Sequence, residues 1–231
     1  PELIGTDTTF LIADENILDF TLDYFRPLKS GRIELGSKLR WRYIPTDMQF
    51  FPGINSVLDM GAAGWANYDE RIAALYTNYV FERNLWEIEA GLRVEYAMLD
   101  YEVIPGHNTY QSDGYTYFQP FPNMRFAYNL DKNNKISLFF NRRVDRPDEQ
   151  DLRIFPKYDD PEILKTGNPT LRPQFTQSVE LGYRTSWNSG YLYTAFYGRQ
   201  TTDIITRVIT RNPADNLLNA ISQNAGTGTN I

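Results

Sequence analysis

Three arginines gather in the stretch Asn-Arg-Arg-Val-Asp-Arg-Pro at 141–147. Arg142, Arg143 and Arg146 carry guanidinium groups, whose planar fork of donors matches carboxylates and other anions. Such a cluster could contact an anionic ligand, or it could brace a long loop against carboxylates of the same chain. We favour the bracing role, so the three arginines are weak candidates for ligand binding in or near the mouth of the fold.

Clustered carboxylates follow the arginines. Asp151, Asp159, Asp160 and Glu162 lie in one Pro-containing segment, and carboxylate oxygens are the ligands that Ca²⁺ prefers. The spacing of an EF-hand loop is absent, and acids in such a segment are usually solvated. We therefore predict no metal site.

No set of residues predicts catalysis. His107 is the only histidine, and a loop histidine without a second histidine or a cysteine is seldom a general base or a metal ligand. Glu87, Glu89 and Glu95 resemble paired acids, but regular alternation along one face of a strand explains them. No Gly-rich phosphate loop follows a strand. We predict neither an enzyme nor a bound cofactor.

Composition narrows the class of protein. The chain has 231 residues, a net charge of −6 and no cysteine. Without a basic block we expect no nucleic-acid partner, and without cysteine there are no disulfides or thiolate metal sites. No run of 18 apolar residues exists, which excludes a membrane helix but not a β-barrel, whose apolar band is hidden in alternation. The chain also opens without a signal-peptide pattern.

Apolar and charged residues alternate along several long segments. In 32–43, for example, Leu35 and Trp41 lie on one parity and Arg40 on the other, and in 86–98 Leu92 lies on one parity and Glu89 on the other. The predicted strands are 17–27, 32–44, 70–82, 85–101, 116–130, 135–144, 174–187 and 191–207. Strand 70–82 has apolar residues on both parities, so its orientation stays open.

Short and long connections alternate between these strands. Short turns are predicted at 29–31, 82–84, 131–134 and 188–190, and long connections at 44–69, 102–115 and 144–173. In an up-and-down barrel, alternate connections emerge at opposite rims, and short turns on one rim with long loops on the other are typical of outer-membrane barrels. Strands of 12–16 residues are also longer than soluble strands usually are.

Aromatic residues near strand ends could form the girdles of a membrane barrel. The candidates are Trp41, Tyr43, Trp86, Phe126, Tyr128, Trp187, Tyr191 and Tyr193. In an ordinary sheet they would instead be packing residues.

Two phrases resemble one family. Asn141, Arg142, Arg143, Arg146 and Pro147 fit a strand-ending Arg-Arg-x-x-Arg-Pro run. The phrase Gly-Asn-Pro-Thr-Leu-Arg-Pro at 167–173, followed by Glu-Leu-Gly-Tyr at 180–183, fits the start of the next strand, with Gln174 where Glu is usual. Together with Ala-Gly-Leu-Arg-Val-Glu-Tyr at 90–96, they make the chain similar to the barrels of TonB-dependent receptors, most of all the outer-membrane β-barrel family common in Bacteroidetes.

The resemblance implies an all-β, antiparallel, up-and-down transmembrane β-barrel of 22 strands in the outer membrane of a Gram-negative cell. It also implies a plug domain, energy supplied through TonB, and a siderophore, cobalamin, glycan or peptide as substrate. We count eight strands and the start of a ninth in 218–231. We therefore expect residues 1–231 to form a single domain, a partial barrel without a plug, with the plug and the TonB contact in a missing N-terminal region.

Two alternatives stay open. One is a small self-contained outer-membrane barrel acting as an adhesin or enzyme, and the other is a soluble glycan-binding β-protein. The side that the apolar parity faces decides among them. A membrane barrel requires Leu35, Trp41, Leu92 and Leu181 to face outward to lipid, whereas a soluble sheet buries them.

Overall fold

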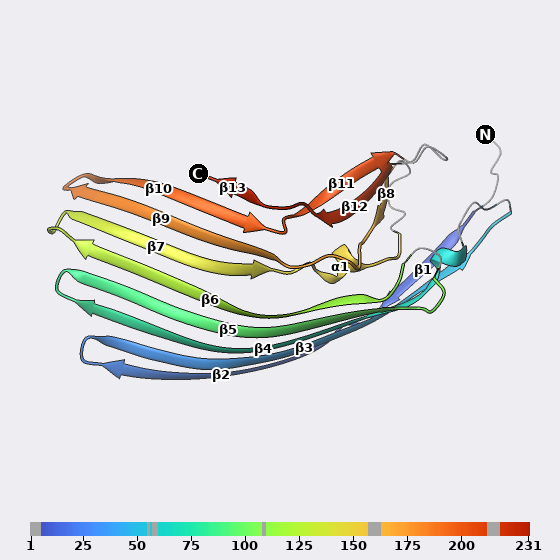
Figure 1. Cartoon of the computed structure of the whole chain (residues 1–231), viewed down its shortest axis with the longest axis horizontal. Coiled ribbons are helices and arrows are strands. Elements are labelled where there is room, and N and C mark those ends of the chain that lie inside the picture. The colour runs from blue at the N-terminus through green and yellow to red at the C-terminus, as the bar shows by residue number, and fades with distance from the viewer. Residues whose placement is uncertain (1–5, 55, 57–59, 108–109, 157–162, 212–217) are drawn as a thin grey trace.

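A computed structural model describes residues 6–54, 56, 60–107, 110–156, 163–211 and 218–231. The described residues form thirteen strands and two short helices (Figure 1). The strands are β1 (Thr8–Ala13), β2 (Asn16–Leu28), β3 (Gly31–Phe51), β4 (Gly64–Arg83), β5 (Trp86–Val103), β6 (Asp113–Asn129), β7 (Asn134–Asp145), β8 (Ile163–Thr166), β9 (Gln174–Trp187), β10 (Gly190–Thr202), β11 (Ile205–Arg211), β12 (Leu218–Asn224) and β13 (Gly228–Asn230). The helices are η1 (Met60–Ala62) and α1 (Glu149–Leu152).

Ten strands make one antiparallel sheet. Its order is β1-β3-β4-β5-β6-β7-β9-β10-β13. Strands β1 and β2 lie end to end along the same edge of β3, with β1 paired to residues 46–51 and β2 to residues 31–43. Within the described residues no ladder joins β2 to β10, so this sheet is open. The architecture is that of an outer-membrane β-barrel, which confirms the predicted fold class.

The two ends of the sheet differ as the loop pattern predicts. Two-residue turns join β2 to β3, β4 to β5 and β9 to β10, and a short turn joins β6 to β7; all lie at the left of Figure 1. Asn84 adopts φ of 54° in its turn, a conformation that Asn tolerates well. The β4–β5 turn is Asn84-Leu85, one residue later than predicted, because Arg83 still pairs with Trp86.

The two faces of the sheet have opposite character. We call outer the face that carries Leu35, Trp41, Leu92 and Leu181, which are 42–51% exposed. The inner face carries Arg40, Glu89 and Glu95 on the alternate positions. Strand β4, unclear from sequence, places Tyr68, Glu70 and Ile72 on the inner face, because each pairs with an inner residue of β3 or β5. The expected outward orientation of the apolar parity is therefore observed.

The apolar band of the outer face has defined limits. On β5 it runs from Trp86 to Met98, roughly 40 Å of strand at about 3.3 Å per residue, or roughly 28 Å of height at a tilt of about 45°. Beyond it, the outer positions of β4 become charged, and Arg71 binds Asp69 at 2.6 Å. Trp41 lies at this limit and donates from Nε1 to Asp69 at 3.0 Å. The band thus fits the thickness of a bilayer and ends in polar groups.

Several strands are longer than predicted. β3 and β4 extend through most of 44–69, which leaves a connection of only 52–63 between them. Pro45 misled the prediction, because proline lacks the N–H that a ladder needs. Its carbonyl accepts from the Asp14 N–H at 3.3 Å, on the side where β1 ends and β2 begins. The Pro45 nitrogen, which has no hydrogen to donate, therefore faces the gap between β1 and β2, where the ladder requires no hydrogen bond.

The predicted strand 191–207 is two strands, and the described residues form thirteen strands rather than eight with the start of a ninth. The chain turns at Asp203, where φ is 55°, and the Asn224 side chain donates to the Asp203 carbonyl at 2.8 Å. After the turn, β11 joins a separate three-stranded sheet in the order β11-β12-β8. The β12–β8 pair is parallel, an exception to the up-and-down pattern.

The inner face near the long connections carries the apolar core. Ile44, Tyr68, Leu99 and Tyr101 pack there against residues of the 146–173 segment. Residues 152–155 and Leu171 thus lie against the sheet, and α1 lies just beyond the end of β7 in Figure 1. Among the described residues, no helix is long and apolar enough to span a bilayer.

Candidate functional site

Ion pairs cover the inner face toward the short turns. Arg40 binds Asp19 of β2 at 2.6 Å, and Lys135 of β7 binds Glu87 of β5 at 2.5 Å. The alternation of the strands places both signs on this face, and the register sets opposite charges within reach of each other. Pairs of this kind contribute little to stability in water, but they make a wall that is charged and wettable.

A buried carboxylate lies at the centre of the inner face. Glu95, on β5, is only 1% exposed. It accepts hydrogen bonds from Arg93 at 2.5 Å, from the Tyr117 hydroxyl at 2.6 Å, and from Arg146. A second buried acid, Glu70 of β4, lies 4.0 Å from the Arg146 guanidinium. Since a buried charge is tolerated only when it is paired and hydrogen-bonded, these five residues form one unit, the Glu95 cluster.

Arg146 connects the Glu95 cluster to the 146–173 segment. Pro147, the next residue, is fully buried and can continue no ladder. The chain leaves β7 here and turns onto the inner face. Asp148 then caps α1, accepting from the Asp151 N–H at 3.0 Å. The Arg146 contact therefore fixes the point at which the segment leaves the sheet.

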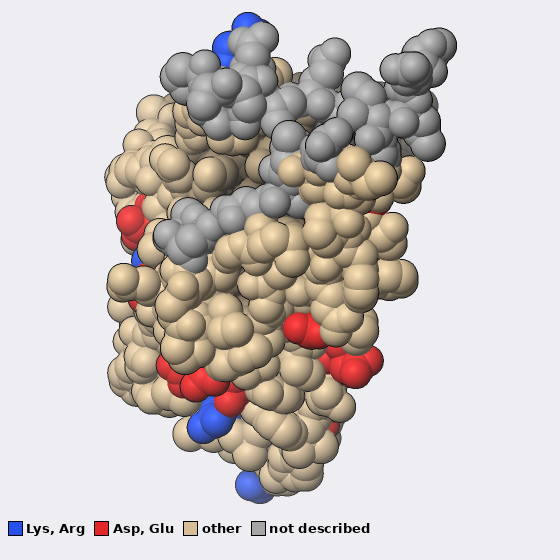
Figure 2. Space-filling model, turned by 90° about the vertical axis from the view of Figure 1, so that its right-hand side faces the viewer, with Lys and Arg blue, Asp and Glu red and all other residues tan. Residues whose placement is uncertain are grey.

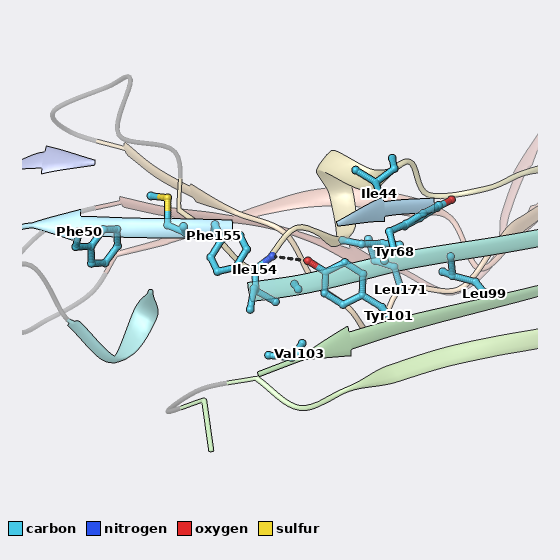
Figure 3. Packing of buried hydrophobic residues seen from close by; sticks show 12 residues of the cluster. Ile44, Phe50, Tyr68, Leu99, Tyr101, Val103, Ile154, Phe155 and Leu171 are labelled. Atoms are coloured by element: carbon cyan, nitrogen blue, oxygen red, sulfur yellow. Dashed lines mark hydrogen bonds between the residues drawn. The ribbon is translucent and has the colours of Figure 1, made fainter. Parts of the chain in front are cut away.

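Hydrophobic contacts hold the rest of the 146–173 segment. Figure 3 shows Ile154, Phe155 and Leu171 against Tyr101 and the neighbouring strands, and the Tyr101 hydroxyl accepts from the Ile154 N–H at 3.3 Å. Arg153 and Glu149 bind each other within α1 and its cap, and this hydrogen bond raises the pKa of the arginine. Leu152, Ile154, Phe155 and Leu171 are thus part of the hydrophobic core.

The Gly-Asn-Pro sequence at 167–169 contacts α1 and its C-cap, near the start of the same segment. The N–H of Gly167 donates to the Arg153 carbonyl at 2.7 Å, and that of Asn168 to the Asp151 carbonyl at 2.7 Å. A Cβ at Gly167 would lie 2.5 Å from the backbone N and O of Arg153, so only glycine fits. The Asn168 side chain donates to the Ser222 carbonyl at 3.0 Å and accepts from the Thr170 N–H at 3.0 Å.

Arg172 anchors the end of the same phrase. Its guanidinium donates to both oxygens of Asp113 at 3.0 Å, and its backbone N–H donates to Asn224 at 2.9 Å. The fork joins the start of β9 to the start of β6, which are far apart in sequence. The residues that carry the family resemblance are therefore largely residues that hold this segment in place.

Arg142 fills an opening in the sheet. The β6–β7 ladder ends at the Asn123–Asn141 pair, beyond which Pro120 and Pro122 cannot donate. Arg142 donates to the Pro120 carbonyl at 2.9 Å and to the Gln119 side chain at 3.0 Å. The arginine thus takes the place of missing strand contacts.

Phe175 uses the same opening. By its position along β9 it shares a parity with Leu181 of the outer face, but its ring stacks on Phe121 at 6.3 Å and meets Tyr117 edge-on at 5.6 Å. Both partners belong to the inner face. Because the β6–β7 ladder stops at the Asn123–Asn141 pair, the Phe175 ring can pass to the inner face beyond it. A continuous ladder would prevent this.

Arg143, the remaining candidate, is exposed and lies 3.5 Å from Asp145. The three arginines thus do not converge: Arg142 faces the opening, Arg143 faces solvent, and Arg146 reaches the Glu95 cluster. Ligand binding by any of them stays a prediction.

The other sequence candidates do not assemble into a site. Asp159, Asp160 and Glu162 lie outside the described residues, and Asp151 accepts a hydrogen bond from Ser222 at 3.3 Å. His107 accepts from the Tyr110 N–H at 3.1 Å, which makes it part of its own loop. Within the described part of the chain, no three His, Asp or Glu side chains group as metal ligands would.

The predicted aromatic girdle is only partly on the outer face. Trp86 packs against Phe126 and Tyr128 there, with ring centroids 5.4 and 4.5 Å apart, and Trp187 is exposed nearby. Tyr191 and Tyr193 were assigned wrongly. The Asn188-Ser189 turn pairs Trp187 with Gly190, so the two tyrosines lie opposite Ser186 and Arg184 on the inner face.

A cavity of about 660 Å³ opens beside the 146–173 segment. It lies between α1, β8, β12 and β1, and its charged lining residues are Asp148, Asp151, Arg153, Lys165 and Arg207. Figure 2 views the molecule from this end and shows a largely uncharged surface with separate acidic patches. The cavity itself is therefore lined by charges of both signs.

Sequence reasoning identified Arg146 but missed its partners. Glu95 looks like any other acid in an alternating strand, and nothing local separates it from Glu87 or Glu89. Tyr117 and Glu70 likewise carry no signal of their own. Only the register of β4, β5 and β6 brings the three together.

Comparisons with known proteins support the architecture. A model of the outer membrane protein beta-barrel family matches residues 6–231. Among solved structures, the copper transporter OprC matches with a TM-score of 0.65 and 12% identity, over 93% of this chain and 33% of that one. A double mutant of the Serratia marcescens hemophore receptor HasR, in complex with its hemophore HasA and heme, matches with a TM-score of 0.58 and 13% identity. That match covers 97% of this chain and 39% of the receptor chain.

The chain thus spans a third to two fifths of the length of these two structures. At such identities the likeness shows the fold alone. No curated protein matches the sequence.

Proposed function

Because the chain belongs to the outer membrane protein beta-barrel family, and so lies in the outer membrane, we propose that it is part of the barrel of a TonB-dependent receptor of the Bacteroidetes type. Its work is to capture a ligand at the mouth and to pass it inward through the lumen. It performs no chemistry on the ligand. Residues 1–231 form one part of a single barrel domain, and the plug and the TonB contact belong to other parts of the protein.

One observation carries this proposal: an apolar outer band of bilayer height lies back to back with a charged inner face. Leu92 and Leu181 are exposed on one side, whereas Glu95 and its arginines lie on the other. A small eight-stranded barrel would pack its interior with side chains. The ion pairs of the inner face, such as Arg40 with Asp19, instead fit the wide lumen of a larger barrel.

The mouth of the barrel supports the role in ligand capture. The long connections 52–63, 104–112 and 146–173 all emerge at one rim. Residues 146–156 and 167–173 are held inward by Arg146 and by the core around Tyr101, so they narrow the lumen at that rim. Copper and heme are handled by the two structural neighbours, so Cu²⁺ and heme are the first probes for the ligand.

The proposal is tested with the full-length protein in detergent. We expect saturable binding to the periplasmic domain of TonB from the same host, and TonB-dependent uptake of a ligand by cells. A protein that migrates as a heat-modifiable barrel but does not bind TonB would contradict the receptor role and leave the barrel intact. A protein that is soluble without detergent and shows no heat-dependent shift would support a soluble glycan-binding protein instead.

A further inference from the structure

On β2 to β5, the charged residues of the outer face lie at the two ends of the apolar band, and these ends differ in sign. Toward the long connections acids prevail: Asp69 and Asp100 lie opposite each other, and a single arginine, Arg71, is bound to Asp69. Toward the short turns, the outer positions of the same strands carry Arg26 and Arg83 and no acid. The two rims of the outer face therefore present different charges to the membrane surface.

Arg26 is the only charged residue among the outer positions of β2. It pairs with Ile33, an outer residue of β3, and lies two residues before the end of its strand. Its neighbours on the same face, Tyr24 and Leu28, are 55% and 41% exposed. Because hydrocarbon cannot solvate a guanidinium group, the Arg26 side chain must extend along this apolar surface to the headgroups at the nearby end of β2.

Lys29 and Arg83 lie at two neighbouring turns. The Glu82 N–H donates to the Ser30 carbonyl at 3.1 Å, which joins the β2–β3 turn to the end of β4. Lys29 precedes Ser30, Arg83 follows Glu82, and both basic side chains are exposed. Figure 1 shows the two turns next to each other at the left end of the sheet. Together with Arg26, these two residues form a cluster that we call the basic rim.

The acids near the basic rim belong to the inner face. Glu34 binds Arg32 at 2.7 Å, and Glu87 binds Lys135 at 2.5 Å. Glu82 lies opposite Glu87 on that same face. Within the described part of the chain, no residue of the basic rim makes a salt bridge or a hydrogen bond to a carboxylate. The positive charge of the rim is therefore left for an anion outside the protein.

We propose that the basic rim binds the headgroup of an anionic phospholipid in the periplasmic leaflet of the outer membrane. Short turns lie at the periplasmic rim of outer-membrane barrels, so these cations lie at the depth of the phosphates. Guanidinium forks match phosphate oxygens, and basic residues at a membrane surface favour anionic lipids. Trp86 lies directly opposite Arg83 and is 44% exposed, which places an indole ring at the interface that such rings prefer. The site requires neither a plug nor TonB.

The test uses the full-length protein in detergent with equal amounts of phosphatidylglycerol and phosphatidylcholine that carry the same acyl chains. Native mass spectrometry counts the lipids that stay bound. We expect at least about fivefold more bound phosphatidylglycerol, since each basic residue near an anionic headgroup contributes to binding. The double variant Arg26→Gln, Arg83→Gln should bring the ratio close to one, whereas Arg26→Lys, Arg83→Lys should keep most of the preference because the charges remain.

Arg71→Gln is the matched control, because Arg71 is an outer-face arginine of β4 at the opposite end of the apolar band. Its ratio should equal that of the wild type. A wild-type ratio near one, an unchanged ratio in the double Gln variant, or an equal loss in Arg71→Gln would each overturn the proposal. Only heat-modifiable, folded protein is compared. Should the double variant fail to fold, Lys29→Gln and Arg83→Gln are measured singly, each with an expected loss of at least about twofold. TonB binding is measured independently, so this proposal can fail while the receptor function stands.

Discussion

The guanidinium of Arg146 donates a hydrogen bond to the buried carboxylate of Glu95, 51 residues earlier in the chain. The contact joins the first residues of the 146–173 segment to the middle of β5. With Arg93 and Tyr117 on the same carboxylate, it fixes how this segment enters the lumen. All variants and their controls are made in the full-length protein.

Replacing Glu95 with Gln should destabilise the protein by about 3 kcal/mol. The amide keeps the size of the side chain but removes the charge, so Arg93 and Arg146 are left partly buried without their counter-ion. The measurement is urea-induced unfolding in detergent or lipid. Glu34→Gln is the control: its partner Arg32 is well exposed, and water screens the pair. Equal losses of unfolding free energy in the two variants would show that the Glu95 cluster contributes no more to stability than an exposed ion pair.

Replacing Gly167 with Ala should loosen the 146–173 segment. The new Cβ would collide with the Arg153 backbone, and the Gly167–Arg153 hydrogen bond would have to stretch. Faster proteolysis and faster hydrogen exchange within the segment are the expected results. Gly198→Ala serves as control, because its nearest contact would be Val179 at an ordinary 3.5 Å. A Gly167→Ala protein that exchanges like wild type would contradict the close packing seen here.

Replacing Leu92 with Arg should cost about 2–4 kcal/mol, because Leu92 lies midway along the apolar band of β5 and a charge there meets hydrocarbon. Met98→Arg, on the same face but at the edge of the band, should cost at most about 1 kcal/mol. Unfolding in lipid vesicles gives both values. If the two substitutions were equivalent, the outer face would not follow the depth profile of a bilayer.

Replacing Arg142 with Lys should loosen the C-terminal end of β7. Lysine carries one compact ammonium group, so it cannot donate to the Pro120 carbonyl and the Gln119 side chain in the same geometry. Hydrogen exchange of the β7 amides beyond Asn141 should accelerate. Arg143→Lys should leave it unchanged, because Arg143 is exposed. Protection that is the same in both variants would remove the bracing role of Arg142.

The sequence by itself determined the fold class, the two faces and the alternation of short and long connections. Each depends on the period of two along a strand or on local turn residues, as in the apolar and charged parities of 86–98. The outward direction of Leu35 and Trp41 was expected only under the barrel interpretation, because apolar groups on alternating strands can face either lipid or a core; their exposure in the structure agrees with that expectation.

Tertiary structure decided the rest, because register is a relation between strands. A two-residue turn after Trp187 turned Tyr191 and Tyr193 inward, although both had been assigned to the outer girdle. The break in the edge opposite Pro45 allowed β3 to continue past a proline. Above all, Arg146 and Glu95 meet only when β5 and the end of β7 lie on one sheet. No local pattern of charge or hydrophobicity records a contact between residues 51 positions apart.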